Sequence, residues 1–126
     1  MERMQAKLRQ QVHQKYAGRC AYCGDEITIK QMHVDHLKPI YRGWGDNHPL
    51  PPGAGTDTPD NMMPACKVCN LWKKTFSLEE FREEIAAQAA RLRRDSAAFR
   101  MAERYGQIKE TFEPVIFYFE LQGASE

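Results

Sequence analysis

Four cysteines stand in two Cys-x-x-Cys pairs, Cys20 with Cys23 and Cys66 with Cys69. Thiolates spaced in this way on a tight turn can share one tetrahedral ion, so two pairs can complete a closed four-cysteine zinc site. In a reducing compartment, close pairs favour metal binding over disulfides. The 42 residues between the pairs exceed the gap of common zinc fingers. The sequence therefore predicts a structural Zn²⁺ from which a sizeable element leaves and returns.

Length and composition indicate one small globular domain. A chain of 126 residues can build only a modest core, for which a metal would be an important support. Its content of 42% hydrophobic and 28% charged residues is ordinary for a soluble protein. The chain has neither an apolar run long enough to span a bilayer nor the apolar core of a secretion signal near its start. We expect a cytoplasmic protein with no membrane partner.

Hydrophobic spacing in the first half predicts one helix and two short strands. Met4, Leu8 and Val12 recur at helical spacing and predict a helix over residues 2–16. Residues 27–29 and 32–34 are β-branched or apolar runs typical of strands. The stretch from residue 42 to 60 is rich in glycine and proline, which predicts a long loop.

The second half reads as mainly helical. Residues 69–75 predict a short helix, and Ser77 with Glu80 forms a capping box. The helix that follows continues until Gly106, either whole or broken near Asp95 and Ser96. Residues 115–119 form a compact apolar run that predicts a buried strand. The expected fold class is α+β in a single domain, 1–126, with the terminal helix and strand in 77–121.

The net charge of +1 is distributed unevenly. Residues 91–104 hold five arginines against two acids, a local charge of +3. Segregated basic surfaces can bind phosphate, although a solvated helix face would look the same. The residues that we expect to contact nucleic acid are four basic residues and one tryptophan of the long loop: Arg91, Arg93, Arg94, Lys74 and Trp44.

A second set of polar residues lies between and beside the cysteine pairs. Asp35 and His36 are adjacent, and Asn70 directly follows the second pair. Oxygen ligands suit a hard divalent cation, and a neutral imidazole suits proton abstraction from water. Asn70 has an alternative role as the cap of the next helix. These residues predict a second, chemically active site.

Taken in order, these elements resemble the HNH endonuclease family over residues 17–76. The motifs are Cys-x-x-Cys, Val34-Asp35-His36-x-x-Pro39, Asn61, Cys-x-x-Cys-Asn and Lys73. The resemblance implies a ββα-metal fold, with the zinc joining hairpin and helix. It implies that Asp35 and Asn70 hold the catalytic ion and that His36 is the general base. It also implies that Asn61 braces the loop and that Lys73 contacts phosphate.

The predicted function is that of a bacterial or phage endonuclease that hydrolyses DNA with Mg²⁺ or another divalent ion such as Mn²⁺. A catalytic ion with few protein ligands keeps positions for substrate oxygens, and the products would be a 5′ phosphate and a 3′ hydroxyl. The alternative is a catalytically silent, zinc-stabilised DNA-binding or adaptor module of the same fold. The sequence leaves open a monomer or homodimer, and a partner in phage packaging or other nucleic-acid processing.

Overall fold

The computed structural model describes residues 5–41 and 53–124, and the predicted α+β class is confirmed. Its elements in chain order are α1 (Ala6–Gln14), β1 (His33–His36), η2 (Pro59–Asn61), β2 (Met62–Ala65), α2 (Lys67–Lys73), α3 (Leu78–Ala86), α4 (Gln88–Asp95), α5 (Ala97–Arg104) and α6 (Tyr118–Ala124). None of the described helices is long and apolar enough to cross a membrane.

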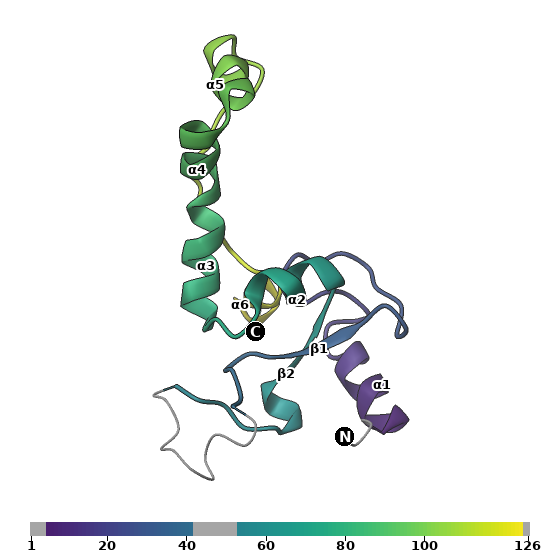
Figure 1. Cartoon of the computed structure of the whole chain (residues 1–126). Helices are drawn as coiled ribbons and strands as arrows, with labels where there is room; N and C mark the ends of the chain where they lie inside the picture. Colours follow the sequence, from purple (N-terminus) through teal and green to yellow (C-terminus); the bar gives the residue numbers. More distant parts are fainter. Residues whose placement is uncertain (1–4, 42–52, 125–126) are drawn as a thin grey trace.

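The centre of the fold is a two-stranded antiparallel sheet with a helix against it. β1 pairs with β2 so that His33 lies opposite Ala65 and His36 opposite Met62. Only Cys66 separates β2 from α2, which packs back on β1 (Figure 1). The strand predicted at 32–34 is thus found one residue later, whereas residues 27–29 are not a strand. The order strand, strand, helix is that of a ββα unit.

Helix α1 is fastened to this unit by long polar side chains. Arg9 donates to the carbonyl oxygens of Ile29 and Met32 at 2.7 and 3.0 Å. Lys15 donates from Nζ to the carbonyl oxygen of Met62 at 2.8 Å. Val12, 2% exposed, anchors the apolar side in a core cluster with Ile27, Met32 and Met62. The helix predicted over 2–16 is therefore confirmed for residues 6–14.

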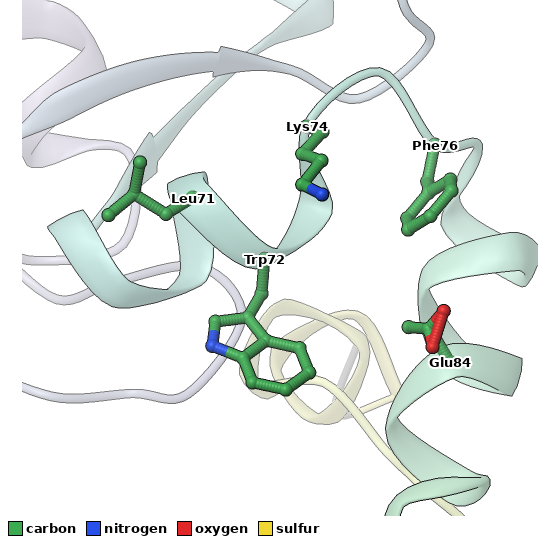
Figure 2. Close-up of a pocket in the computed structure, with 5 residues that line it drawn as sticks. All are labelled: Leu71, Trp72, Lys74, Phe76 and Glu84. Atoms are coloured by element: carbon green, nitrogen blue, oxygen red, sulfur yellow. The ribbon is translucent and has the colours of Figure 1, made fainter.

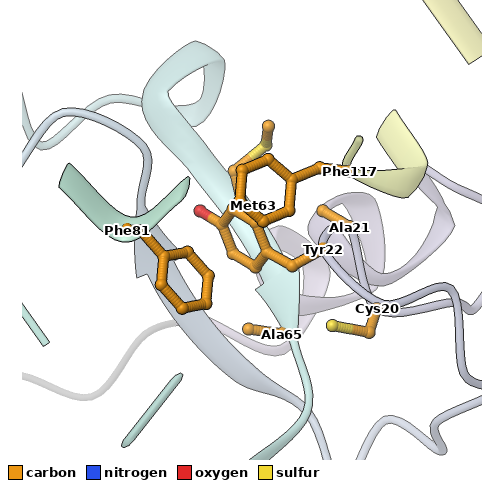
Figure 3. Close-up of a cluster of buried hydrophobic side chains, with 7 residues drawn as sticks. All are labelled: Cys20, Ala21, Tyr22, Met63, Ala65, Phe81 and Phe117. Carbon is orange, nitrogen blue, oxygen red and sulfur yellow. The ribbon is translucent and has the colours of Figure 1, made fainter. Parts of the chain in front are cut away.

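Three aromatic rings from distant parts of the chain form the second core cluster (Figure 3). Tyr22 lies edge-on to both Phe81 and Phe117, with ring centroids 5.6 and 5.5 Å apart. Phe81 stacks on Phe117 at 5.3 Å. Such pairs contribute about 0.5–1.5 kcal/mol each beyond the burial of their area. The cluster joins the first cysteine turn, α3 and the C-terminal segment into one core.

The predicted long helix is three shorter helices, which project from the sheet as an arm (Figure 1). The capping box at its start is confirmed, because Ser77 accepts from the Glu80 amide and Glu80 accepts from the Ser77 amide. A turn at Ala87 separates α3 from α4. Ser96 adopts an extended backbone and its hydroxyl accepts from the amide of Phe99. This new cap ends α4 and begins α5, so the break near Asp95 is real.

The terminal strand predicted at 115–119 is wrong. The run is instead an irregular segment that leads into α6, which begins at Tyr118. The amides of Tyr118 and Phe119 donate to the carbonyl oxygens of Tyr22 and Ala21. The amide of Ala21 in turn donates to Pro64 of β2 at 2.8 Å. The first cysteine turn thus occupies the place beside β2, and the terminal run attaches to that turn rather than to the sheet.

Arg82 holds the terminal segment against α3. Its guanidinium donates to the carbonyl oxygen of Val115 at 2.5 Å and to Glu120 at 2.6 Å. The same group lies 4.9 Å from the ring centroid of Phe117. Since Phe117 is 2% exposed, the segment beyond α5 is part of the core and not an appendage.

Replacement of Phe117 by Ala should therefore destabilise the whole domain. Loss of a buried phenylalanine costs about 3–5 kcal/mol, which urea unfolding of the zinc-loaded protein would measure. Phe112→Ala is the matched control, because that ring is 82% exposed, and its effect should stay within about 0.5 kcal/mol. Equal effects of the two substitutions would show that the terminal segment does not contribute to the core.

Candidate active site and metal centre

The four cysteines converge on one point. Their sulfur atoms all lie within 4.8 Å of one another, and the sulfurs of Cys23 and Cys66 are 3.8 Å apart. An ideal tetrahedral zinc site with Zn–S bonds of about 2.3 Å places its sulfurs about 3.8 Å apart. The arrangement thus fits Zn²⁺ with little movement, as the spacing predicts. Cys66 also serves as the cap of α2, where its sulfur accepts from the amide of Cys69.

The cysteines of the cluster differ in how readily they lose a proton. A hydrogen bond from Cys69 lowers the pKa of Cys20 to about 4. That bond and then burial raise the pKa of Cys69, while burial raises the pKa of Cys23 to about 12. A zinc ion must therefore displace protons from Cys23 and Cys69, so its affinity falls as the pH falls.

Asp35 is held from two sides beneath the surface of β1. The carboxylate is 6% exposed, and its Oδ2 accepts from the Tyr22 hydroxyl at 2.5 Å. The ammonium of Lys73 lies 3.1 Å from the same oxygen. Burial, and then the charge of Asp35, raise the pKa of Tyr22, so this phenol remains a donor. Both contacts fix the orientation of the carboxylate.

Lys73 occupies a different place from the one the resemblance implies. Its side chain is completely buried, and its Nζ also donates to the carbonyl oxygen of His36 at 2.9 Å. A buried ammonium needs a counter-ion, and Asp35 provides it. The expected phosphate contact does not fit this position. Lys73 is instead an internal support of the Asp35–His36 segment.

His36 lies where β1 ends, beside a small cavity. The cavity measures about 110 Å³, and among its lining residues are Asp35, His36, Lys74 and Thr75. Neighbours on a regular strand point to opposite faces, and the end of β1 allows both side chains to border one space. The imidazole is 15% exposed, with Nε2 2.8 Å from Oδ1 of Asp57. Nothing in the sequence distinguishes Asp57, because it lies 21 residues from His36 along the chain.

Asn61 braces the loop that follows His36. Its side chain is paired with both the amide and the carbonyl of Lys38 at 2.9 Å, and it donates to Thr56 at 2.8 Å. Gly55 packs so closely that a Cβ there would lie 2.2 Å from the Lys38 carbonyl oxygen. The sequence alone does not single out Gly55, because its close packing against Lys38 arises only in the folded chain. The predicted brace is in place geometrically.

Asn70 lies within α2 rather than at a helix cap. It precedes Lys73 by three residues and Lys74 by four, so it shares the helix face that turns toward β1. Its side chain is half-buried and does not line the small cavity. Trp44 falls outside the described residues.

The three arginines predicted to contact nucleic acid are each paired with acids. Arg91 contacts Glu84, and Arg94 contacts Asp95 at 2.8 Å. Arg93 bridges Glu103 and Glu110 at 2.8 and 2.6 Å. These pairs offset the charge of the three arginines and hold the arm together. Contact of these arginines with nucleic acid stays a prediction.

Residues 20–76 of the chain match the family model of the HNH endonucleases. The match supports a nuclease-type function with a nucleic-acid substrate, and the cysteine cluster supports zinc binding.

Among solved structures the chain is similar to the type II-C Cas9 enzyme from Actinomyces naeslundii, with 16% identity and a TM-score of 0.48. The likeness covers 90% of this chain but 12% of that one, and it carries no argument for activity here. No curated protein matches this chain.

Removal of one zinc ligand should unfold the domain. Cys66→Ser takes away a thiolate ligand, while the serine hydroxyl can still cap α2, and structural zinc contributes on the order of 10 kcal/mol in small domains. We expect loss of bound zinc, measured by a colorimetric metal assay, together with loss of cooperative thermal unfolding. A metal-free variant that still melts cooperatively would contradict the structural role of the ion.

Lys73 and its neighbour offer a matched test of the buried pair. Lys73→Met leaves the Asp35 carboxylate buried without its cation, which should cost about 3–5 kcal/mol. Lys74→Met changes an exposed side chain and should shift the stability by about 0.5 kcal/mol or less. Urea unfolding of both variants, loaded with zinc but free of Mg²⁺, would measure the difference. Similar midpoints would mean that Asp35 does not depend on Lys73.

Proposed function

We propose that the chain is a metal-dependent DNA endonuclease in which Asp35 and Asn70 hold the catalytic ion and His36 is the general base. The observation that carries this proposal is the meeting of the Asp35 carboxylate and the His36 imidazole at one small cavity. The match of residues 20–76 to the HNH endonuclease model supports the same reaction class.

The donor set suits a hard cation such as Mg²⁺ or Mn²⁺. A carboxylate and an amide oxygen are ligands that such ions prefer, and two protein ligands leave room for substrate. Tyr22 and Lys73 both contact Oδ2 of Asp35, so Oδ1 is the oxygen that can receive an ion. When bound, the ion supplies positive charge to the phosphate and to the departing 3′ oxygen.

His36 takes the proton from the attacking water. With Nε2 directed at Asp57, the tautomer protonated at Nε2 leaves Nδ1 as the proton acceptor. Asp57 then holds the ring and stabilises the charge that it gains, as carboxylates do for catalytic histidines. The water oxygen forms a bond to phosphorus while the bond to the 3′ oxygen breaks, and the 3′ oxygen takes up a proton from solvent. The products are a 5′ phosphate and a 3′ hydroxyl.

The brace around Asn61 supports this role of His36. The peptide that follows His36 is held because the amide of Leu37 donates to the Asn61 carbonyl at 2.9 Å, while the Asn61 side chain holds Lys38. The histidine therefore has a fixed backbone on its C-terminal side and Lys73 beneath its carbonyl. A base fixed in this way needs little reorganisation before proton transfer.

The test is conversion of supercoiled plasmid to nicked circles by the zinc-loaded protein, with and without added Mg²⁺ or Mn²⁺. His36→Ala should lower the rate about 10²–10⁴-fold, the usual contribution of a general base. His33→Ala is the control, because that side chain is exposed at the other end of β1. If the unaltered protein binds DNA but never nicks it, the chain is the silent module; if His36→Ala nicks as fast as the parent, the base is another group.

A further inference from the structure

A second, larger cavity lies beside the proposed catalytic one. It measures about 350 Å³ and is lined by residues of α2, α3 and the turn between them: Leu71, Trp72, Lys74, Phe76 and Glu84 (Figure 2). This volume is within the range of about 300–1,000 Å³ found for ligand sites. Nothing in the nuclease mechanism uses its aromatic residues.

The side chains of this cavity have the chemistry of a base-stacking platform. Trp72 is 47% exposed, although a large ring at a helix surface would normally be buried more completely. Figure 2 shows Trp72 on one side of the space, Phe76 on the other, and Lys74 between them. Exposed aromatic rings next to a cation are the usual means of binding single-stranded nucleic acid, because every base has a π-face.

The charges around the cavity are compatible with a phosphate backbone. Glu84 is the acid in its wall, and this carboxylate is already paired with Arg91 and accepts from Gln88. Lys74 is exposed, and it has no acidic partner among the ion pairs of the described residues. A strand that crosses here would therefore meet one positive charge and no uncompensated negative one.

Lys74 connects the two cavities, because it lines both. Thr75 faces the catalytic cavity and Phe76 the aromatic one, and their Cα atoms are only about 3.8 Å apart. The backbone of Lys74 has φ 51° and ψ −127°, a conformation that residues other than glycine rarely adopt. A lysine in a backbone conformation that suits glycine suggests that its side chain has a function.

We propose that this aromatic cavity binds an unpaired base next to the scissile phosphate, with Trp72 and Phe76 as stacking surfaces and Lys74 on the adjoining phosphate. This rests on the proposed nuclease function and narrows its substrate class. Bases within a duplex already stack on one another, so the favoured substrate is a single strand or a duplex with an unpaired or displaced segment.

Binding can be measured without cleavage in a His36→Ala background. The chain has two tryptophans, so adding Trp44→Phe leaves Trp72 as the sole reporter. An oligothymidylate of about 12 nucleotides, a length typical of single-strand sites, should quench this fluorescence, and a blunt duplex of equal length should quench it much less. Equal or stronger quenching by the duplex would overturn the proposal.

Variants separate stacking from charge. Trp72→Ala should weaken binding of the labelled oligothymidylate, followed by anisotropy, on the order of tenfold, whereas Phe112→Ala should not. Lys74→Gly removes the cation at a position that suits glycine, and should reduce the slope of log affinity against log salt by about 0.7. Lys109→Ala, far along the chain, is the control for charge.

The outcomes for this cavity and for catalysis are distinguishable. If Trp72→Ala binds the oligothymidylate as tightly as the parent, the cavity does not take a base, even when the unaltered protein nicks plasmid. If the cavity behaves as expected but the unaltered protein never cuts, the proposed catalysis fails while the binding site stands.

Discussion

The convergence of four sulfur atoms is the constraint on which the rest of the molecule depends. One pair lies in the turn beside β2, and the other forms the first turn of α2. An ion shared by both fixes the start of that helix relative to the sheet. The last turn of the same helix carries Lys73 beneath Asp35 and Lys74 at the edge of the cavity. The four-cysteine site thus sets the position of the Asp35 carboxylate and that of the neighbouring cation, Lys74.

The parts of this arrangement that could be predicted are those encoded by local spacing. Two Cys-x-x-Cys pairs specify a tetrahedral ligand set wherever they are brought together. The Asp35–His36 pair and Asn61 are likewise readable along the chain. Of the two strands only β1 was predicted, because β2 contains Pro64, a residue that argues against a strand. The capping box at Ser77 is local too, since both of its hydrogen bonds join residues three apart. Motifs of this kind do not depend on contacts between residues that are far apart in the sequence.

The parts that could not be predicted are those decided by partners far away in sequence. Lys73 reads as a surface cation, yet its ammonium is buried and contacts Asp35 of β1, which is far from it in the sequence. The arginines of the arm read as a basic face until the acids on neighbouring turns are placed beside them. The apolar run near the C-terminus has the composition of a strand, but the position beside β2 is already taken. Charge pairing and edge occupancy are properties of the folded chain.

Tyr22 belongs both to the turn of the four-cysteine site and to the surroundings of Asp35. It lies between Cys20 and Cys23, and its hydroxyl reaches Asp35. The turn that places the tyrosine is the same turn that presents two of the four cysteines. A zinc ion bound by those cysteines would therefore also steady the hydrogen bond that orients the Asp35 carboxylate. Through this one residue the structural metal and the proposed catalysis are linked.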